Sequence, residues 1–411
     1  MTNQSYRWVI VAAGGLLGCV AMGTLFSLPI FLAPISAATG WSHTGISTAM
    51  TIGFLAMALA SIGWGSLSDR IGPRPVVGIG ALGLTASVFL ASYSPSLLVF
   101  QVLFGMIAGV SIAAFFAPLM AAVTGWFDTQ RSLAVSLVSA GIGVAPVTMT
   151  PLTAWLVSEY DWRLSMRILA VIAAAILVPA TLLLRRPPAL ERAAAGVPSA
   201  VPMDEVDRSD MTVRQALLSP PFIILALTNF FCCATHSGPI FHTVSYAIAC
   251  GIPAITAATI YSVEGIAGMF GRLGFGVVAD RLGAKNVLAW GLLIQALGAL
   301  GYFFSSTLPA FYAAASLFGF VYAGIMPLYA VLARENFPLR MMGTIIGGSS
   351  MAGSLGMAIG PLLGGWLYDT TGSYGGMYLT CFGMGIGAFL IALTFRPFPK
   401  KEPKLAGAVA A

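Results

Sequence analysis

The chain has 411 residues, of which 58% are hydrophobic and 8% are charged, and its formal net charge is +6 at pH 7. Its mean hydropathy of +0.90 excludes a soluble globular protein, because such a chain would expose too much apolar surface to water. Windows without Asp, Glu, Lys or Arg, such as 8–68 and 75–127, are long enough for spans of about 20 residues across a hydrocarbon core of about 30 Å. We therefore expect an integral membrane protein.

Hydropathy divides the chain into twelve candidate transmembrane helices. In chain order they cover residues 8–34, 45–68, 76–94, 97–125, 132–157, 164–184, 220–248, 253–279, 286–305, 308–333, 343–367 and 374–395. A polar stretch separates six helices from six, and 212–218 within it is compatible with a short surface helix. The sequence thus predicts an all-α membrane protein with an N-terminal bundle at 1–184, a linker at 185–219, a C-terminal bundle at 220–396 and a tail at 397–411.

The basic residues indicate the orientation of the chain. If the N terminus is cytoplasmic, seventeen of the twenty Lys and Arg residues lie at the cytoplasmic face, Arg163 and Arg167 lie at the opposite face, and Arg272 lies within the membrane. The positive-inside rule then places both termini in the cytoplasm. The same bias explains the net charge without a nucleic-acid partner. The first apolar stretch is longer than the apolar region of about 7–15 residues in a signal peptide, and the absence of sorting signals favours a bacterial inner membrane.

A loop motif occurs twice. Residues 65–74 and 276–285 both match G-x-x-x-D-R-x-G-x-[RK], at equivalent places in the two halves and 211 residues apart. The glycines allow neighbouring helices to approach closely, and the Asp-Arg pairs can cap helix ends and bond across the cytoplasmic face. We expect a latch that opens and closes as the halves move, formed by Gly65, Asp69, Arg70, Gly276, Asp280 and Arg281.

The doubled motif, the six-plus-six layout and the linker resemble the major facilitator superfamily, as does the glycine-rich segment 356–365. This resemblance implies two six-helix bundles around a central cavity that opens alternately to each side, with the substrate site near the midplane. A narrower resemblance is to the monocarboxylate transporters and the oxalate and formate exchangers. It rests on Arg272 in span eight, on Trp126-Phe127 with 131–134, and on 160–163. In that group the arginine of helix eight is implicated in holding the substrate carboxylate, a role that the resemblance carries to Arg272.

The chemistry of arginine also points to Arg272, independently of the family resemblance. An arginine stays protonated, and its insertion at the centre of a membrane helix costs about 2.5–3.5 kcal/mol. The nearest acid within the membrane is Glu264, eight residues earlier and therefore about 12 Å along the helix axis. A ligand carboxylate fits the guanidinium better, whereas the alternative is a structural arginine bonded to backbone carbonyls or water. Because 343–368 contains no second cation of the kind that oxalate exchangers carry in span eleven, a monocarboxylate is preferred over a dicarboxylate.

Glu264 is the candidate for proton coupling, because desolvation favours its neutral form and hydration favours proton release. The alternative is a hydrogen bond to a neighbouring helix. Weaker candidates for substrate contacts, each of which could instead be a packing residue, are Asn229, His236, His242, Phe115, Phe116 and Tyr322. The pair Gly238-Pro239 is expected to bend or break span seven.

These features favour a secondary active transporter of a small monocarboxylate such as lactate or pyruvate, working by alternating access in the lipid bilayer with proton coupling. The alternatives are an exporter of lipophilic drugs and an anion exchanger of the oxalate/formate type. Catalytic clusters, nucleotide-binding loops and metal-ligand spacings are absent from the sequence, so we expect neither an enzyme nor a cofactor nor a metal site. The transporter is expected to work as a monomer.

Overall fold

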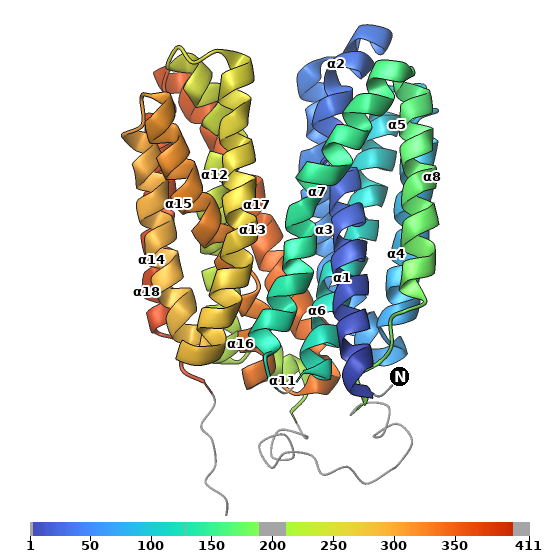
Figure 1. Cartoon of the computed structure of the whole chain (residues 1–411), viewed down its shortest axis with the longest axis vertical. Helices are drawn as coiled ribbons and strands as arrows, with labels where there is room; N and C mark the ends of the chain where they lie inside the picture. The colour runs from blue at the N-terminus through green and yellow to red at the C-terminus, as the bar shows by residue number, and fades with distance from the viewer. Residues whose placement is uncertain (1–2, 128, 189–210, 398–411) are drawn as a thin grey trace, which may run out of the picture.

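The computed structural model describes residues 3–127, 129–188 and 211–397, which form helices joined by short turns and loops and contain no β-strand within these ranges. Figure 1 shows the long helices in two groups that stand side by side, one made by the first half of the chain and one by the second. The N-terminal group contains α1 (Asn3–Leu25), α2 (Leu28–Thr39), α3 (His43–Ile71), α4 (Pro73–Ala91), α5 (Leu97–Phe100), a π-helical stretch (Gln101–Ile107), α6 (Ala108–Trp126), α7 (Arg131–Glu159) and α8 (Trp162–Thr181).

The C-terminal group follows the linker. It contains α11 (Val213–Leu217), α12 (Pro220–Ala249), α13 (Ala254–Leu282), α14 (Ala284–Phe303), α15 (Leu308–Ile325), α16 (Leu328–Asn336), a 3-10 turn (Leu339–Met341), α17 (Met342–Thr371) and α18 (Gly375–Leu393). The short helix α11 begins with a capping box between Thr212 and Gln215, which is a typical helix start. Residues 189–210, which hold most of the predicted linker, and the predicted tail from 398 onward lie outside the described residues.

Each predicted span has a helical counterpart, with three local differences. The fourth span, 97–125, consists of α5, the π-helical stretch and α6. The first span is divided into α1 and α2, and the tenth is divided into α15 and α16 beside Pro327, because proline lacks the N–H that a continuous helix needs. Gly238-Pro239, by contrast, does not break span seven, since α12 continues through both residues. Packing against neighbouring helices compensates for a single lost hydrogen bond within a membrane bundle.

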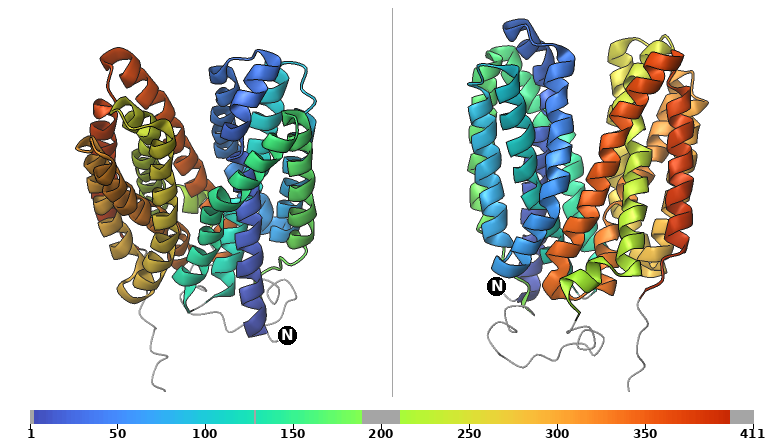
Figure 2. Two further views of the ribbon diagram at one scale, coloured as in Figure 1. Left: turned by 45° about the horizontal axis from the view of Figure 1, so that its top comes forward. Right: turned by 180° about the vertical axis from the view of Figure 1, so that it is seen from behind.

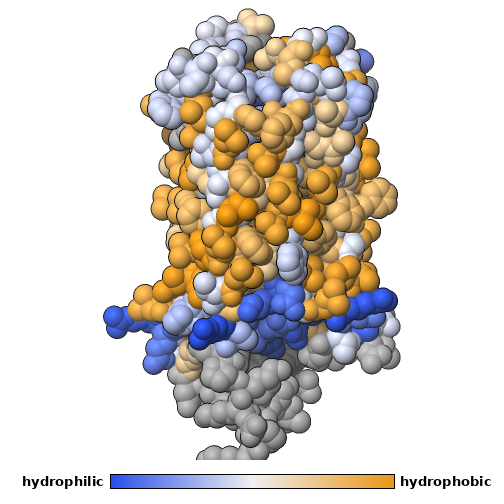
Figure 3. Space-filling view, turned by 90° about the vertical axis from the view of Figure 1, so that its left-hand side faces the viewer, coloured by the Kyte–Doolittle hydropathy of each residue, from blue (hydrophilic) through white to orange (hydrophobic). Residues whose placement is uncertain are grey.

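The surface of the molecule fits a lipid bilayer. Within the described residues, nine helical segments are long and apolar enough to cross a membrane, and α7, α13 and α17, with 29, 29 and 30 residues, account for the remaining spans. Figure 3 shows a broad hydrophobic belt that ends at a hydrophilic band near one end of the molecule. We call this end, which carries Arg70, Arg186, Arg281 and Arg340, the basic end. The protein is therefore a multi-pass membrane protein.

The two groups meet at the basic end and diverge toward the other end (Figure 2). Contacts between the groups are made mainly by α3 with α17 and by α7 with α13. Within the C-terminal group, glycines allow close helix packing. Gly271 of α13 lies against the backbone of Phe320 in α15, and Gly360 of α17 lies against Ser237 and the backbone of Gly238 in α12. A side chain larger than hydrogen has no room at Gly271 or Gly360.

We predict that Gly271→Ala destabilises the C-terminal group, because the new methyl group would overlap the carbonyl of Phe320 and force α13 away from α15. The expected loss is about 1–3 kcal/mol, as for other overpacked sites. The matched control is Gly265→Ala on the same helix, where an added Cβ meets nothing within 4 Å. Thermal unfolding in one detergent is the measurement, and equal midpoints for the two variants would contradict the role of Gly271.

Candidate substrate site and latch

At the basic end, α7 and α17 are among the helices that begin without a side-chain cap of their own. Each is capped by an aspartate from the other helix group. Asp280, at the end of α13, accepts hydrogen bonds from the backbone N–H groups of Ser132 (3.1 Å) and Leu133 (3.2 Å). Such a carboxylate satisfies two otherwise unpaired N–H groups and interacts favourably with the positive end of the helix dipole.

Asp69, at the end of α3, makes the equivalent contact with α17. It accepts hydrogen bonds from the N–H groups of Gly343 (2.7 Å) and Thr344 (2.8 Å) and from the Thr344 hydroxyl (2.6 Å). Donors and acceptors in the two halves are each 211 residues apart, so the two contacts are related by the internal repeat. The aspartates of the doubled motif therefore join the halves reciprocally.

The motif glycines lie in the same contact regions. Gly65 packs against the backbone of Gly343, and a Cβ on Gly276 would lie 2.6 Å from the Ser136 hydroxyl of α7. The side chains of Arg70 and Arg281 are exposed instead. Arg70 contributes its backbone carbonyl, which accepts a hydrogen bond from Arg186 at 2.6 Å.

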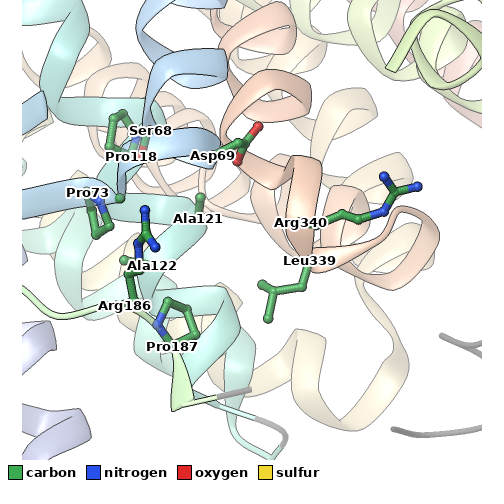
Figure 4. A pocket seen from close by; sticks show the side chains of 11 residues that line it. Ser68, Asp69, Pro73, Pro118, Ala121, Ala122, Arg186, Pro187, Leu339 and Arg340 are labelled. Atoms are coloured by element: carbon green, nitrogen blue, oxygen red, sulfur yellow. The ribbon is translucent and has the colours of Figure 1, made fainter. Parts of the chain in front are cut away.

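A pocket of about 180 Å³ lies beside this contact and is formed by both helix groups and the start of the linker. Figure 4 shows that Asp69 and Arg186 lie at different sides of the pocket, and that the side chain of Arg340 extends away from the other labelled residues. The guanidinium of Arg340 bonds to the backbone carbonyl of Met211. This pocket belongs to the contact region at the basic end. Arg272 lies further along α13, away from that end.

Arg272 lies ten residues before the end of α13 at Leu282, which places it about 15 Å from the basic end of that helix. Its Nε donates a hydrogen bond to the hydroxyl of Ser139 on α7, at 3.2 Å. Its Nη1 lies directly against Gly143, one helical turn further along α7. The guanidinium thus reaches from the C-terminal group to the N-terminal group, and within the described residues no carboxylate forms an ion pair with it.

Glu264 faces away from Arg272, into the C-terminal group. It is only 1% exposed, its backbone packs against Gly319 of α15, and its Oε2 accepts a hydrogen bond from the Tyr302 hydroxyl of α14 at 2.9 Å. The second oxygen, Oε1, is fully buried and has no hydrogen-bond partner among the described residues. Glu264 and Arg272 form no direct bridge, as their separation along the helix predicts.

Between these two residues lies an aromatic and polar cluster. Tyr322 of α15 stacks on the ring of His236, with centroids 5.0 Å apart, and it interacts electrostatically with both Arg272 and Glu264. Nδ1 of His236 lies 3.2 Å from the amide nitrogen of Gln295 on α14. Helices α12, α13, α14 and α15 therefore bring Arg272, His236, Tyr322 and Glu264 into one region.

The other sequence candidates lie elsewhere. Asn229 is buried and donates to the backbone carbonyl of Ser349 (2.8 Å) and to its hydroxyl (3.0 Å), so it joins α12 to α17. His242 packs against Gly364 and the ring of Tyr374. Phe115 lies in the core of the N-terminal group, and Phe116 packs against the core cluster nearer the basic end. In the described part of the chain, no group of three or more His, Cys, Asp or Glu residues could hold a metal ion.

Three residues near the candidate site were missed from the sequence: Ser139, Gln295 and Tyr302. Gln295 carries a usable signal, because it is a long polar side chain in the middle of an apolar span and must find a partner there. Ser139 and Tyr302 carry none, since serine and tyrosine are common in membrane helices and their partners lie on other helices.

Comparisons with known proteins agree with this architecture. The model of the Major Facilitator Superfamily matches residues 14–348 and 273–411. Monocarboxylate transporter 13 of Rattus norvegicus is 26% identical over 394 residues, covering 95% of this chain and 88% of the rat protein. Monocarboxylate transporter 12 of Mus musculus is 25% identical over 459 residues, covering 98% and 90%. The crystal structure of the human organic anion transporter MFSD10 superposes with a TM-score of 0.72 at 17% identity, covering 95% of this chain and 100% of that one.

Two groups of membrane helices with a contact region at one end and a buried charge between them define a two-bundle transporter, not an enzyme. The chain belongs to the Major Facilitator Superfamily. Both the predicted fold and the resemblance to the monocarboxylate transporter group are confirmed.

We predict that Asp69→Ala and Asp280→Ala each shift the protein away from the described conformation, because each removes a cap worth about 0.5–2 kcal/mol. The measurement is the distance between spin labels at Tyr160 and Ser306, which are exposed at the end opposite the basic end. The labels should approach each other in both variants and more so in the double variant. Ser66→Ala, which changes the same loop motif but no cap, is the control, and an unchanged distance distribution in the double variant would argue against a latch.

Proposed function

We propose that the protein moves a small monocarboxylate across the membrane by alternating access, with Arg272 binding the carboxylate. The observation that carries this proposal is the environment of Arg272, a guanidinium between the two helix groups that has a hydroxyl partner but no carboxylate partner among the described residues. Leaving such a charge unpaired is costly, and a carboxylate matches the guanidinium with two charge-assisted bonds. The names of the relatives, monocarboxylate transporters, support the same substrate class.

The number of carboxylates on the proposed substrate follows from the number of fixed positive charges that the protein offers. No Lys or Arg occurs from Gly343 to Tyr368 in α17, so a second carboxylate would have no fixed charge there. Lactate-like and pyruvate-like acids are the preferred cargo. An exchanger of dicarboxylates and an exporter of lipophilic drugs are the alternatives, and the drug exporter predicts inhibition by hydrophobic cations where our proposal predicts inhibition by short carboxylates.

The proposal also includes the orientation of the chain in the membrane and the coupling of transport to protons. Both termini and the basic end face the cytoplasm under the positive-inside rule, so the described conformation has its helix groups joined on the cytoplasmic side. Glu264 carries the coupled proton, since its carboxyl group is buried with one oxygen unpartnered, and burial favours the neutral, protonated form over the carboxylate. A bacterial inner membrane, the domain limits at 184 and 219, and the monomeric state stay predictions.

Arg272→Gln is expected to lower kcat/KM for labelled lactate in proteoliposomes by about 10-fold to 100-fold, because it removes a charged hydrogen-bonding partner of the carboxylate. Arg272→Lys should recover only part of the activity, since lysine keeps the charge and lacks the fork. Ser139→Ala is the control, because it removes the present partner of Arg272 without removing the charge. Wild-type uptake by Arg272→Gln, or no competition by unlabelled short acids, would exclude the proposed site.

Glu264→Gln is expected to abolish the stimulation of uptake by an inward proton gradient while substrate exchange at equal pH on both sides continues. Glutamine keeps the hydrogen bond from Tyr302 but cannot bind or release a proton. Uptake is measured with and without an imposed pH gradient. The control is Tyr302→Phe, which removes the hydrogen bond and leaves the carboxyl group. Unchanged gradient stimulation in Glu264→Gln would disprove this role.

A further inference from the structure

The residues that lead into the linker stay bound to the N-terminal group after α8 has ended at Thr181. Three hydrogen bonds hold them there. These bonds run from the Tyr6 hydroxyl to the carbonyl of Leu183 (2.9 Å), from Nε1 of Trp126 to the carbonyl of Arg185 (3.3 Å), and from Nη2 of Arg186 to the carbonyl of Arg70 (2.6 Å). The segment 183–186 is therefore fixed on α1, α3 and α6 and is not a free tether.

Pro187, the next residue, is buried where the two helix groups meet. A Cβ atom on Gly125 of α6 would lie 2.6 Å from Cγ of Pro187 and 2.7 Å from Cδ1 of Leu339. Leu339 belongs to the 3-10 turn before α17 and is only 5% exposed. Since both atoms lie so close to one point, the two side chains are neighbours, and Figure 4 shows them at the same pocket. Pro187 thus fills the space between an N-terminal helix and a C-terminal turn.

The other described end of the linker is bound to the C-terminal group. Arg340 bonds to the backbone carbonyl of Met211, and Ala216 of α11 is fully buried. Because Leu339 and Arg340 are consecutive, both described ends of the linker reach one turn of the C-terminal group. The start is fixed to the N-terminal group and the end to the C-terminal group, so the two ends can meet at this turn only while the groups are joined at the basic end.

The internal repeat does not account for this contact. Gly72 of the first loop motif has a φ of +91°, and a Cβ there would lie 2.6 Å from Nε of Arg186. Gly283, which occupies the same position of the second motif, has a φ of +85°, but a Cβ there would meet nothing within 4 Å. The two motifs share the backbone turn, whereas only the first one is contacted by a side chain of the linker. This contact is therefore an addition to the repeated pair of aspartate caps.

We propose that Pro187 seals the contact region at the basic end, packing against Gly125 and Leu339 while the groups are joined and losing Leu339 when they separate. Separation would expose the apolar surfaces of the proline and the leucine to water, so the seal favours the described conformation. Arg186 is the positioning residue, since its bond to the carbonyl of Arg70 holds the adjacent proline in place. The seal adds an apolar contact to the two aspartate caps and does not depend on which substrate is carried.

The experiment measures the conformation at both ends of the molecule with two pairs of spin labels. One pair, at Pro75 and Asn286, is exposed at the basic end, and the other, at Tyr160 and Ser306, is exposed at the opposite end. Opening of the basic end should lengthen the first distance and shorten the second. A general loss of packing would instead broaden both distance distributions without opposite shifts.

Leu339→Ala removes the C-terminal side of the seal. It should lower the ratio of the described conformation to the opened one about tenfold, as expected for the lost burial of a leucine side chain. Arg186→Gln should lower this ratio about threefold to tenfold, because the bond to the carbonyl of Arg70 is lost. Arg74→Gln is the matched control, since it removes an equal charge from the same end, and Arg74 is exposed and makes no side-chain hydrogen bond within the described residues.

Combined variants distinguish the seal from a general weakening. Because Leu339→Ala and Arg186→Gln act on the same proline, the double variant should exceed the larger single effect only slightly. Arg186→Gln with Asp280→Ala, which act at different contacts, should show the product of the two effects.

Three results would overturn the inference: single variants that shift the distances no more than Arg74→Gln, broadening at both ends without opposite shifts, or full additivity of Leu339→Ala and Arg186→Gln. The measurement uses no substrate. Its failure would leave the proposed carboxylate transport intact, and uptake that does not depend on Arg272 would leave the seal intact.

Discussion

The two helix groups are joined by aspartates that each complete a helix of the other group. Asp69 and Asp280 bond to the same two positions in the first turns of α17 and α7. A charge at a helix N-terminus contributes about 0.3–2 kcal/mol, depending on exposure, and both contacts lie at the edge of the membrane. Contacts of this size hold one conformation and can be broken and re-formed at moderate cost. Because both contacts join the two groups at the basic end, a separation of the groups there would break both.

Under the proposed function, Arg272 connects the substrate to this arrangement. Its Nε bonds to Ser139 on the opposite group, and Ser139 lies on α7, the helix that Asp280 caps. A carboxylate that binds the guanidinium competes with the serine hydroxyl for the same donor face. Ligand binding would then change a contact between the groups without any further residue having to transmit the effect. Such a direct link is a physical basis for coupling between binding and conformational change.

The sequence was informative where a feature can be interpreted without knowing which residues it contacts. An arginine in an apolar span, an acid near the midplane and a motif repeated at 211 residues can be read from the chain, and the spans follow from hydropathy. The partners could not be read in this way. Ser139 is 133 residues from Arg272, and Tyr302 is 38 residues from Glu264. Nothing in either local pattern distinguishes these side chains from packing residues, because their role arises only when helices from different parts of the chain pack together.

Structural polar residues differ from candidates for function in whether the polar atoms of the buried side chain all have hydrogen-bond partners. Asn229 looked as suitable as His236 in the sequence, yet its amide nitrogen bonds twice to Ser349 and its oxygen accepts from the thiol of Cys233. It therefore has little capacity left for a ligand.

Glu264 differs from Asn229 in this respect, because its Oε2 accepts a hydrogen bond from Tyr302 whereas its Oε1 has no partner among the described residues. The bonded oxygen fixes the side chain, and the other oxygen remains available for a proton. Burial of a half-satisfied polar group lowers stability, and the proposed proton-binding role would explain why Glu264 is buried in this state.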